Sequence, residues 1–285
     1  MNTWPAPGIH EGVPFPVYRS DDITNRDTIE TVQGKATSKS TITDFLADPW
    51  QWRNRPAKET TAAMGFGSLV DTLLLEPTKF ESRYALSPYS DFRKKEAQEW
   101  RDAMSSAGVE VITEDTMARA HDTVEAIRRN TIAAGLLDGA RTQVAFRHPT
   151  RFGFDSKGLI DIVPQDETAL VDLKTCSASA LEDKRSLQRH LFEYGYHIQA
   201  GAYCDGWAAA GGEERTRFLF IFVASTPPHR VAVIELPYAA ISYGASQYAA
   251  GLAQFAQCLE RNHWPSIWDG LVELDLPQYA YLDEE

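Results

Sequence analysis

The stretch that decides the fold is TALVDLKT, Thr168 to Thr175, an apolar strand that carries two charges. Its aliphatic residues are typical of a strand inside a sheet, yet Asp172 and Lys174 stand among them with one residue between. Because side chains alternate along a strand, this spacing places the carboxylate and the ammonium on the same face. Another apolar strand just upstream, GLIDIVP from Gly158 to Pro164, has one acid, Asp161, at its centre.

These two strands are predicted to form a hairpin that brings the acids together. With Asp166-Glu167 as the tight connection, counting back along the strands places Asp161 directly opposite Asp172, with Cβ atoms about 5 Å apart. Two ionised carboxylates at that distance repel each other, and the repulsion grows as the dielectric constant falls inside a sheet. A divalent cation between them removes the conflict, since Mg²⁺ is typically held by one or two carboxylates, waters and a substrate phosphate. The hairpin therefore predicts a site for Mg²⁺ or Mn²⁺.

Lys174 adds a cation on the same face as the two acids. An ammonium there can orient an attacking water or neutralise a phosphate in the transition state, which is the chemistry of metal-assisted phosphodiester hydrolysis. The alternative is structural: Asp172 and Lys174 form an exposed ion pair on an edge strand, and Asp161 is an acid in a turn.

The following helix carries a second signal in YGYHIQAGAYCDGW, where Gln199 and Tyr203 lie four residues apart and hence on one face. An amide and a phenol on one face can hydrogen-bond a DNA phosphate or hold the end of a strand. The alternative is that the aromatic residues of this helix only pack in the core, namely Tyr196, Tyr203 and Trp207.

Together, Asp161, Asp172-x-Lys174 and Gln199-x-x-x-Tyr203 resemble the PD-(D/E)xK nuclease superfamily, in its RecB/lambda-exonuclease branch. The resemblance extends from about residue 38 to residue 280 and is strongest to the RecE-type exonucleases of phages and prophages. Four further segments carry it: SKSTITDFLADPWQWR, GFGSLVDTLLLEPTKF, YGYHIQAGAY and HWPSIWDGLVELDLPQYA.

The resemblance implies an α/β fold with a restriction-endonuclease-like core, a mixed central sheet flanked by helices, and an N-terminal helical extension. It implies an exodeoxyribonuclease that uses two Mg²⁺ or Mn²⁺ ions and digests linear duplex DNA from 5′ to 3′. Such enzymes form homo-oligomeric rings around DNA ends and pass the exposed 3′ strand to a RecT-like single-strand annealing protein. Carried over by residue, the metal ligands are Asp161, Asp172 and the Leu173 carbonyl, Lys174 is catalytic, and Gln199 and Tyr203 lie at the DNA end.

Two positions depart from the family pattern. Asp71 stands where a histidine is usual and can still supply an oxygen ligand to a metal, whereas Gln143 stands where a glutamate is common and brings no negative charge. The second metal depends on these positions. They support an alternative function, a catalytically weakened nuclease fold that binds DNA ends or loads an annealing protein.

The net charge of −12 repels nucleic acid globally, so a DNA-binding role requires local basic patches. The candidates are three clusters, of which the third is preferred because it adjoins the catalytic strand: Arg53, Arg55 and Lys58; Arg93, Lys94 and Lys95; Lys184, Arg185 and Arg189. The three cysteines contain no C-x-x-C pair for zinc and are one too few for a four-cysteine iron–sulfur cluster.

The chain divides into an irregular arm over residues 1–36 and a single nuclease domain over residues 37–285, with a helical part (37–112) and a catalytic core (113–285). Within the core we expect helices over about 113–137, 186–210 and 240–262. Three successive antiparallel strands, followed by two more after the second helix, complete it. No run of about 18 apolar residues and no signal-peptide pattern occurs, so we expect a protein of the bacterial cytoplasm that has no membrane partner.

Overall fold

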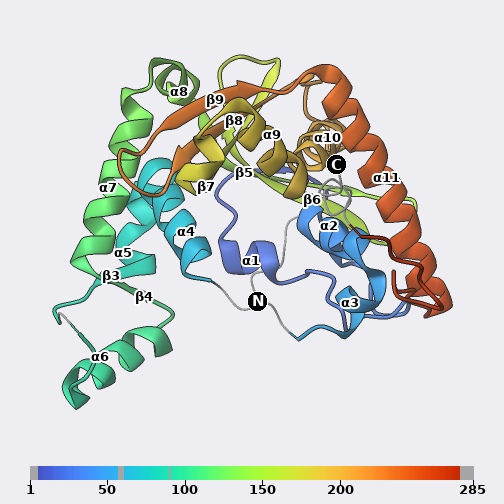
Figure 1. The fold of residues 1–285 in the computed structure, drawn as a ribbon, viewed down its shortest axis with the longest axis horizontal. Helices are drawn as coiled ribbons and strands as arrows, with labels where there is room; N and C mark the ends of the chain where they lie inside the picture. Colours follow the sequence, from blue (N-terminus) through green and yellow to red (C-terminus); the bar gives the residue numbers. More distant parts are fainter. Residues whose placement is uncertain (1–5, 57–60, 90, 277–285) are drawn as a thin grey trace, which may run out of the picture.

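A mixed sheet of seven strands runs through the middle of the computed structural model, which describes residues 6–56, 61–89 and 91–276 (Figure 1). The strand order is β1-β5-β6-β7-β8-β9, and β2 pairs with β6 beside this row. The bounds are β1 Gly8–His10, β2 Ala36–Ser38, β5 Arg141–Pro149, β6 Asp155–Val163, β7 Ala169–Cys176, β8 Arg217–Ala224 and β9 Val231–Glu235.

The predicted run of three antiparallel strands is confirmed as β5, β6 and β7. The next strand, β8, lies parallel to β7, and β9 is antiparallel to β8. A parallel neighbour requires a crossover connection, which here consists of the short helix η2 (Ala178–Leu181) and helices α9 (Lys184–Glu193) and α10 (Tyr196–Ala209). The sheet is therefore mixed and flanked by helices, as the sequence predicts.

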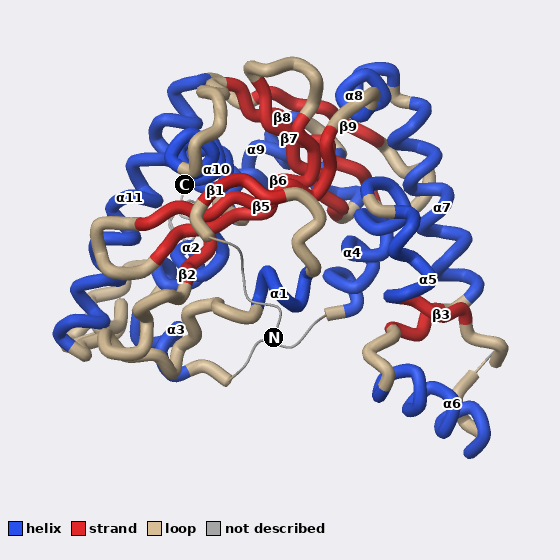
Figure 2. The backbone as a smooth tube through the Cα atoms, turned by 180° about the vertical axis from the view of Figure 1, so that it is seen from behind, coloured by secondary structure: helices blue, strands red, loops and turns tan. Residues whose placement is uncertain are grey.

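Helices cover both faces of this sheet (Figures 1 and 2). One face packs against α9, α10 and α11 (Tyr238–Arg261), and the other packs against α4 (Ala62–Leu75), α7 (Glu114–Arg129) and α8 (Thr131–Leu137). Strand β8 is buried on both sides, so its side chains alternate between the two cores. Phe218, Phe220 and Phe222 belong to the α10 side, whereas Leu219, Ile221 and Val223 belong to the α4 side.

Two of the predicted helices are each interrupted. The helix expected over 113–137 begins after Thr113 as predicted but is two helices, because the Asn130 side chain accepts hydrogen bonds from the Ile132 and Ala133 amides and starts α8. The helix expected over 186–210 is divided into α9 and α10 at Gly195, which adopts a left-handed φ of 59°. Glycine takes this conformation without steric cost.

The helical part consists of short elements. Helix α2 (Lys39–Ala47) is followed at once by α3 (Pro49–Asn54), in which Pro49 begins a new helix while the Asp48 side chain caps it. Further along come η1 (Pro77–Lys79), α5 (Phe80–Arg83), the strand pair β3 (Tyr84–Leu86) and β4 (Glu110–Ile112), and α6 (Lys95–Ser106). Figure 1 shows α6 projecting away from the main sheet below β3 and β4.

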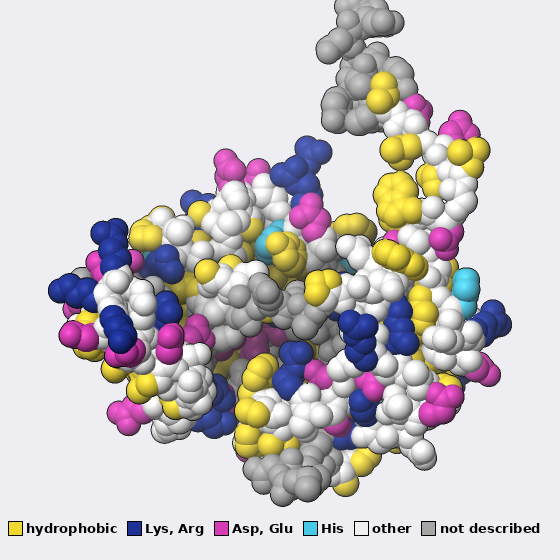
Figure 3. Space-filling view, turned by 90° about the horizontal axis from the view of Figure 1, so that it is seen from below, with side chains coloured by type: hydrophobic (Ala, Val, Ile, Leu, Met, Phe, Trp, Pro, Cys, Tyr) yellow, Lys and Arg dark blue, Asp and Glu magenta, His cyan; other side chains and the backbone are white. Residues whose placement is uncertain are grey.

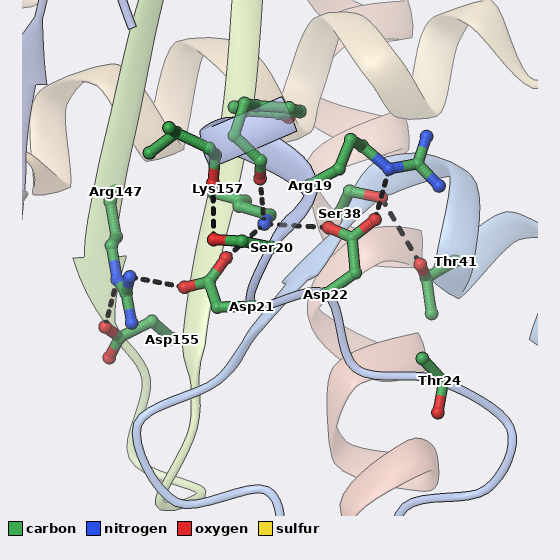
Figure 4. A network of polar contacts seen from close by, with 12 residues as sticks. Arg19, Ser20, Asp21, Asp22, Thr24, Ser38, Thr41, Arg147, Asp155 and Lys157 are labelled. Carbon is green, nitrogen blue, oxygen red and sulfur yellow. Dashed lines mark hydrogen bonds and ion pairs between the residues drawn. The ribbon is translucent and has the colours of Figure 1, made fainter. Parts of the chain in front are cut away.

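The segment before residue 37 is more regular than the arm expected from its composition. Strand β1 pairs with β5, α1 (Phe15–Arg19) packs on the sheet, and β2 lies parallel to β6. Figure 4 shows what fixes this segment: Asp21 lies 2.5 Å from Nζ of Lys157 on β6 and 2.5 Å from Nη1 of Arg147 on β5. Lys157 is fully buried, so the carboxylates of Asp21 and Asp22 compensate the charge of its ammonium, which water cannot reach.

The surface has two notable features in Figure 3. The face seen from below is hollowed near its middle, and acidic and basic side chains lie there. At the upper right, the segment that leads to the C-terminal grey atoms extends away from the body with exposed apolar side chains, among them Trp268, Leu271 and Leu274. Within the described ranges, none of the helices combines the length and apolar character needed to cross a membrane.

Candidate active site

Asp172 and Lys174 form an ion pair on β7. Nζ of Lys174 lies 2.5 Å from Oδ2 of Asp172, and Asp172 is only 2% exposed. Burial opposes the charge of Lys174, but the carboxylates of Asp172 and Asp161 outweigh it and hold the pKa of the ammonium above its ordinary value. Lys174 therefore remains charged at neutral pH, in a buried ion pair rather than the exposed one of the structural alternative.

Asp161 reaches the same place from β6. The register pair Ile162↔Val171 agrees with the predicted hairpin, but the Asp161 carboxylate turns towards β7, where its Oδ2 accepts a hydrogen bond of 2.9 Å from the Leu173 amide. Burial raises the pKa of Asp161 well above its ordinary value, and the neighbouring carboxylates of Asp172 and Asp71 raise it further. The repulsion predicted between the facing acids is thus present in the folded chain.

Asp71 on α4 joins this cluster. Burial raises its pKa to about 7, Lys174 lowers the pKa, and Asp172 raises it. Helix α4 comes this close because Gly67 leaves room for β7: a Cβ at that position would lie 3.0 Å from Oγ1 of Thr175. The structure therefore brings Asp71 to the acids of the hairpin.

The cluster has the chemistry to hold a divalent cation. Three carboxylates (Asp71, Asp161 and Asp172) and one ammonium (Lys174) influence one another, which leaves an excess of two negative charges when all are ionised. Among the described residues, Oδ2 of Asp172 accepts no hydrogen bond of good geometry, although it forms the ion pair with Lys174. A buried carboxylate oxygen without a hydrogen-bond donor is suited to bind a metal ion.

The described residues contain no group of three or more Asp, Glu, His or Cys side chains arranged to enclose a metal unaided. Mg²⁺ keeps several waters and takes only one or two protein carboxylates, so the Asp161 and Asp172 carboxylates have the chemistry to hold it. The Leu173 carbonyl stays a predicted ligand.

Gln143 on β5 stands beside Asp161 of the neighbouring strand β6. Its Nε2 donates to Oδ1 of Asp161 at 3.1 Å. Its φ of 52° is rare for a residue that is not glycine and interrupts the regular strand of β5. The amide therefore lies close to the cluster and adds a hydrogen-bond donor there instead of a fourth carboxylate.

The structure places Gln199 beside Asp172 and packs Tyr203 against the sheet, and their contact with a DNA end stays a prediction. Gln199 is 5% exposed and its Nε2 donates to Oδ1 of Asp172. The Tyr203 ring packs edge-on against Phe146, with centroids 5.5 Å apart, on the inner side of the sheet. Tyr203 and Trp207 thus pack in the core, as the alternative had it. Gln199 holds the Asp172 carboxylate in place by a direct hydrogen bond.

A cleft of about 1270 Å³ opens above the cluster between α4, the end of β7 and α9. Asp71, Leu173 and Lys174 line it, as does Arg189 from the preferred basic cluster. The other two members of that cluster, Lys184 and Arg185, are exposed in the first turn of α9.

The remaining basic clusters lie elsewhere. Arg53 donates to the Asp27 carbonyl, Arg55 pairs with Asp44, and Lys58 lies outside the described residues. The cluster of Arg93, Lys94 and Lys95 lies just before and at the start of the projecting helix α6.

Arg119 and Tyr196 also line the cleft and were missed by the sequence analysis. Arg119 lies over the Phe66 ring at 4.3 Å, and its buried Nε has no hydrogen-bond partner among the described residues. Tyr196 lies beneath Nζ of Lys174 at 5.3 Å. Neither residue belongs to a recognisable motif. Their positions depend on how α7 and α10 pack on the sheet, and a local sequence pattern does not predict this packing.

A family model described as a PDDEXK-like domain of unknown function (DUF3799) matches residues 37–270. The chain belongs to this family. The predicted PD-(D/E)xK relationship and restriction-endonuclease-like fold are therefore confirmed. No protein with curated annotation matches the sequence.

Solved structures agree with the fold. A provisionally named exonuclease from Eubacterium rectale is 14% identical with a TM-score of 0.56, over 87% of this chain and 93% of that chain. A phage-related exonuclease from Haemophilus somnus is 14% identical with a TM-score of 0.39, over 82% and 99%. An alkaline exonuclease from Laribacter hongkongensis is 17% identical with a TM-score of 0.30, over 65% and 95%. At these identities the first likeness supports the fold alone.

Proposed function

We propose that this protein is a metal-dependent exodeoxyribonuclease that hydrolyses phosphodiester bonds at the ends of linear duplex DNA. The observation that carries the proposal is the buried cluster beside the cleft, where Asp161 from β6 and Asp172 from β7 lie next to the charged Lys174, which itself lines the cleft. The carboxylates of Asp71, Asp161 and Asp172 repel one another, and packing does not require them. Keeping them together costs stability unless a cation neutralises their charge.

Each residue has a distinct role in this proposal. Asp161, Asp172 and the Leu173 carbonyl hold Mg²⁺ or Mn²⁺, with Asp71 as the candidate ligand of a second ion. The bound metal supplies a Lewis acid that activates water and polarises the phosphate. Lys174 lines the cleft, where its ammonium orients the attacking water and stabilises the charge that develops on the phosphate.

The finer features rest on the resemblance to RecE-type exonucleases. They are digestion from 5′ to 3′, a ring of several copies around the DNA, and delivery of the exposed 3′ strand to a RecT-like annealing protein in the bacterial cytoplasm during phage-type recombination. Arg189 at the rim of the cleft, with Lys184 and Arg185 beside it on α9, supplies the local positive charge that an acidic protein needs to approach a phosphate backbone.

The test compares end-labelled linear duplex with a closed circular duplex of the same sequence, in Mg²⁺ and in Mn²⁺. We expect release of label from the linear DNA only, and no release with EDTA. Asp172→Asn is the matched control, because it retains the shape of the side chain and removes its charge. Cleavage of the circle at the rate of the linear DNA would exclude an exonuclease, and undiminished activity of Asp172→Asn would exclude this site.

A second function is favoured by one observation, the amide of Gln143 against Asp161. With a neutral donor in place of a carboxylate, the cluster binds a second cation less strongly, and the protein would then bind DNA ends or load an annealing protein without cutting. Under this alternative the wild type is inactive, and Asp71→His combined with Gln143→Glu creates activity. Under the first proposal the wild type already cuts.

A further inference from the structure

Three aromatic rings lie face to face where α9, α10 and α11 meet. Phe192 stacks on His197 with centroids 5.4 Å apart and planes at 6°, and His197 stacks on Tyr243 at 5.9 Å and 7°. We call Phe192, His197 and Tyr243 the corner rings. The middle ring is buried and held by a hydrogen bond of 2.7 Å between its Nε2 and Oε1 of Gln247. The outer rings are 67% and 55% exposed, so they present aromatic surface to solvent.

A second pair of rings lines the cleft that holds the catalytic lysine. Tyr194, 56% exposed, stacks on Tyr196 at 5.7 Å and 21°, and both line the cleft. Tyr196 in turn lies beneath Nζ of Lys174. Only one residue separates Phe192 from Tyr194 in the chain, at the end of α9. The end of α9 therefore carries one aromatic side chain of the cleft and one of the corner rings.

Packing does not require this exposure. A large aromatic side chain buried in a core stabilises a protein by a few kcal/mol, and an exposed one contributes little of that. The corner nevertheless holds two outer rings in solvent, in nearly parallel planes, with the middle ring fixed by Gln247. A fixed flat surface of this kind suits a flat ligand that can extend the stack.

We propose that the corner rings and Tyr194 form a stacking surface for the unpaired bases of single-stranded DNA next to the active site. This inference rests on the proposed function, because single-stranded DNA is what remains when one strand of a duplex is digested. Bases in a duplex are stacked on one another and shielded, whereas unpaired bases expose their faces and bind aromatic rings without regard to sequence.

Stacking also provides affinity for DNA that the negative net charge of the protein does not oppose. A net charge of −12 limits how much affinity for DNA can come from phosphate contacts. Aromatic rings attract bases through their faces, so this part of the affinity does not depend on releasing counterions. Binding at the corner rings should therefore change little with salt, while binding through Arg189 at the cleft should weaken as salt rises.

The test measures the affinity for a fluorescent oligothymidylate by anisotropy, in EDTA, for the wild type, Phe192→Ala and Tyr243→Ala. Each alanine variant should weaken binding about 5- to 150-fold, the range known for loss of one base–aromatic stack. Phe192→Trp should retain the affinity, whereas Phe192→Leu, which keeps apolar bulk without a ring, should lose it. Affinity for a blunt duplex should not change.

Controls separate stacking from other causes. Trp50→Ala removes an aromatic side chain that is 53% exposed on α3, away from the corner, and should leave binding unchanged. For Phe192→Ala the slope of log Kd against log salt should equal that of the wild type, whereas Arg189→Ala should make it shallower.

Three results would overturn the inference. They are unchanged affinity in both alanine variants, equal losses in Trp50→Ala and Phe192→Ala, or full retention of affinity in Phe192→Leu. A change in oligomeric mass together with unchanged DNA affinity would instead show that a second copy covers the corner rings. Because no divalent metal is present, a protein without nuclease activity still gives a binding result, so failure of the proposed function and failure of the stacking surface are distinguished.

Discussion

At the scale of single residues, Asp172 depends on Gln199. The amide of Gln199 donates to Oδ1 of Asp172, and both side chains are at least nine-tenths buried. Gln199→Ala removes that donor and leaves the carboxylate held only through its Oδ2, by Lys174. Because partners that hold a ligand in place typically contribute 10- to 100-fold to metal affinity, we expect the variant to need about that much more Mg²⁺ for half-maximal cleavage. A titration with the metal measures this, and an unchanged midpoint would contradict the role.

Asp27 provides a residue-scale prediction for pH. Burial disfavours its charge, but hydrogen bonds from Lys35, Thr24 and Thr31 outweigh burial and lower the pKa of the carboxyl. A carboxyl with a lowered folded-state pKa stabilises the fold above its unfolded pKa of about 4, and this stability is lost as the pH falls through the folded pKa. Asp27→Asn should therefore cost about 1–3 kcal/mol of unfolding free energy at neutral pH.

The cost should diminish at an acid pH below the lowered pKa of Asp27, where the wild-type carboxyl itself gains its proton. Urea unfolding of both proteins at the two pH values measures the difference. Lys35 lies 2.5 Å from Asp27, so Lys35→Met is a useful companion that should reproduce part of the loss at neutral pH. An equal penalty at both pH values would show that the charge of Asp27 is not what stabilises this turn.

Site residues could be predicted from the sequence where their positions depend only on neighbouring residues. Strand alternation identified Asp172 and Lys174, and the length of the hairpin connection brought Asp161 to them, because both depend only on nearby sequence. Gln199 was found by its spacing but assigned to DNA, since its partner Asp172 is 27 residues away in the chain. Arg119 carried no signal, because its place depends on how α7 packs.

At the scale of elements, the crossing of α10 and α11 sets the position of Gln199. A Cβ at Gly244 would lie 1.8 Å from the His197 carbonyl oxygen, so the two helices can approach this closely only at glycine. Gly244→Ala should push them apart and cost about 1–3 kcal/mol of unfolding free energy. Gly135→Ala on α8 is the matched control, since no atom lies within 4 Å of the added Cβ. It should stabilise the fold by up to about 1 kcal/mol.

Urea unfolding of the two variants tests this prediction. Equal effects in Gly244→Ala and Gly135→Ala would mean that the helix crossing does not need glycine. Cleavage assays add a second readout, because a displaced α10 should also weaken the hold on Asp172, whereas the Gly135 variant should cut as the wild type does.

Elements with long periodic patterns were predicted well, and short ones were not. Strands β5 to β9 and helix α11 follow from alternation and helical periodicity over many residues. Strands β1 and β2 have three residues each and gain their stability from pairing with distant strands, so the segment before residue 37 was expected to be irregular. The breaks at Asn130 and Gly195 are set by one side chain and one backbone angle.

At the scale of the whole molecule, the candidate site lies at β7, a central strand of the sheet. Strands β6 and β7 carry Asp161 and Asp172, α4 adds Asp71, and Gln199 on α10 donates a hydrogen bond to Asp172. The family match over residues 37–270 covers all of these elements. The ring of several copies stays a prediction, because assembly depends on surfaces that local sequence patterns do not describe.

The most direct test of the account is the single-turnover rate of cleavage at a linear duplex end, in saturating Mg²⁺, for the wild type and Lys174→Ala. Removing the ammonium leaves the carboxylates in place, so the metal should still bind, and a single turnover isolates the chemical step from assembly and product release. The account predicts that the wild type cuts and that Lys174→Ala is at least about 100-fold slower while remaining folded. Equal rates for the two proteins would contradict it.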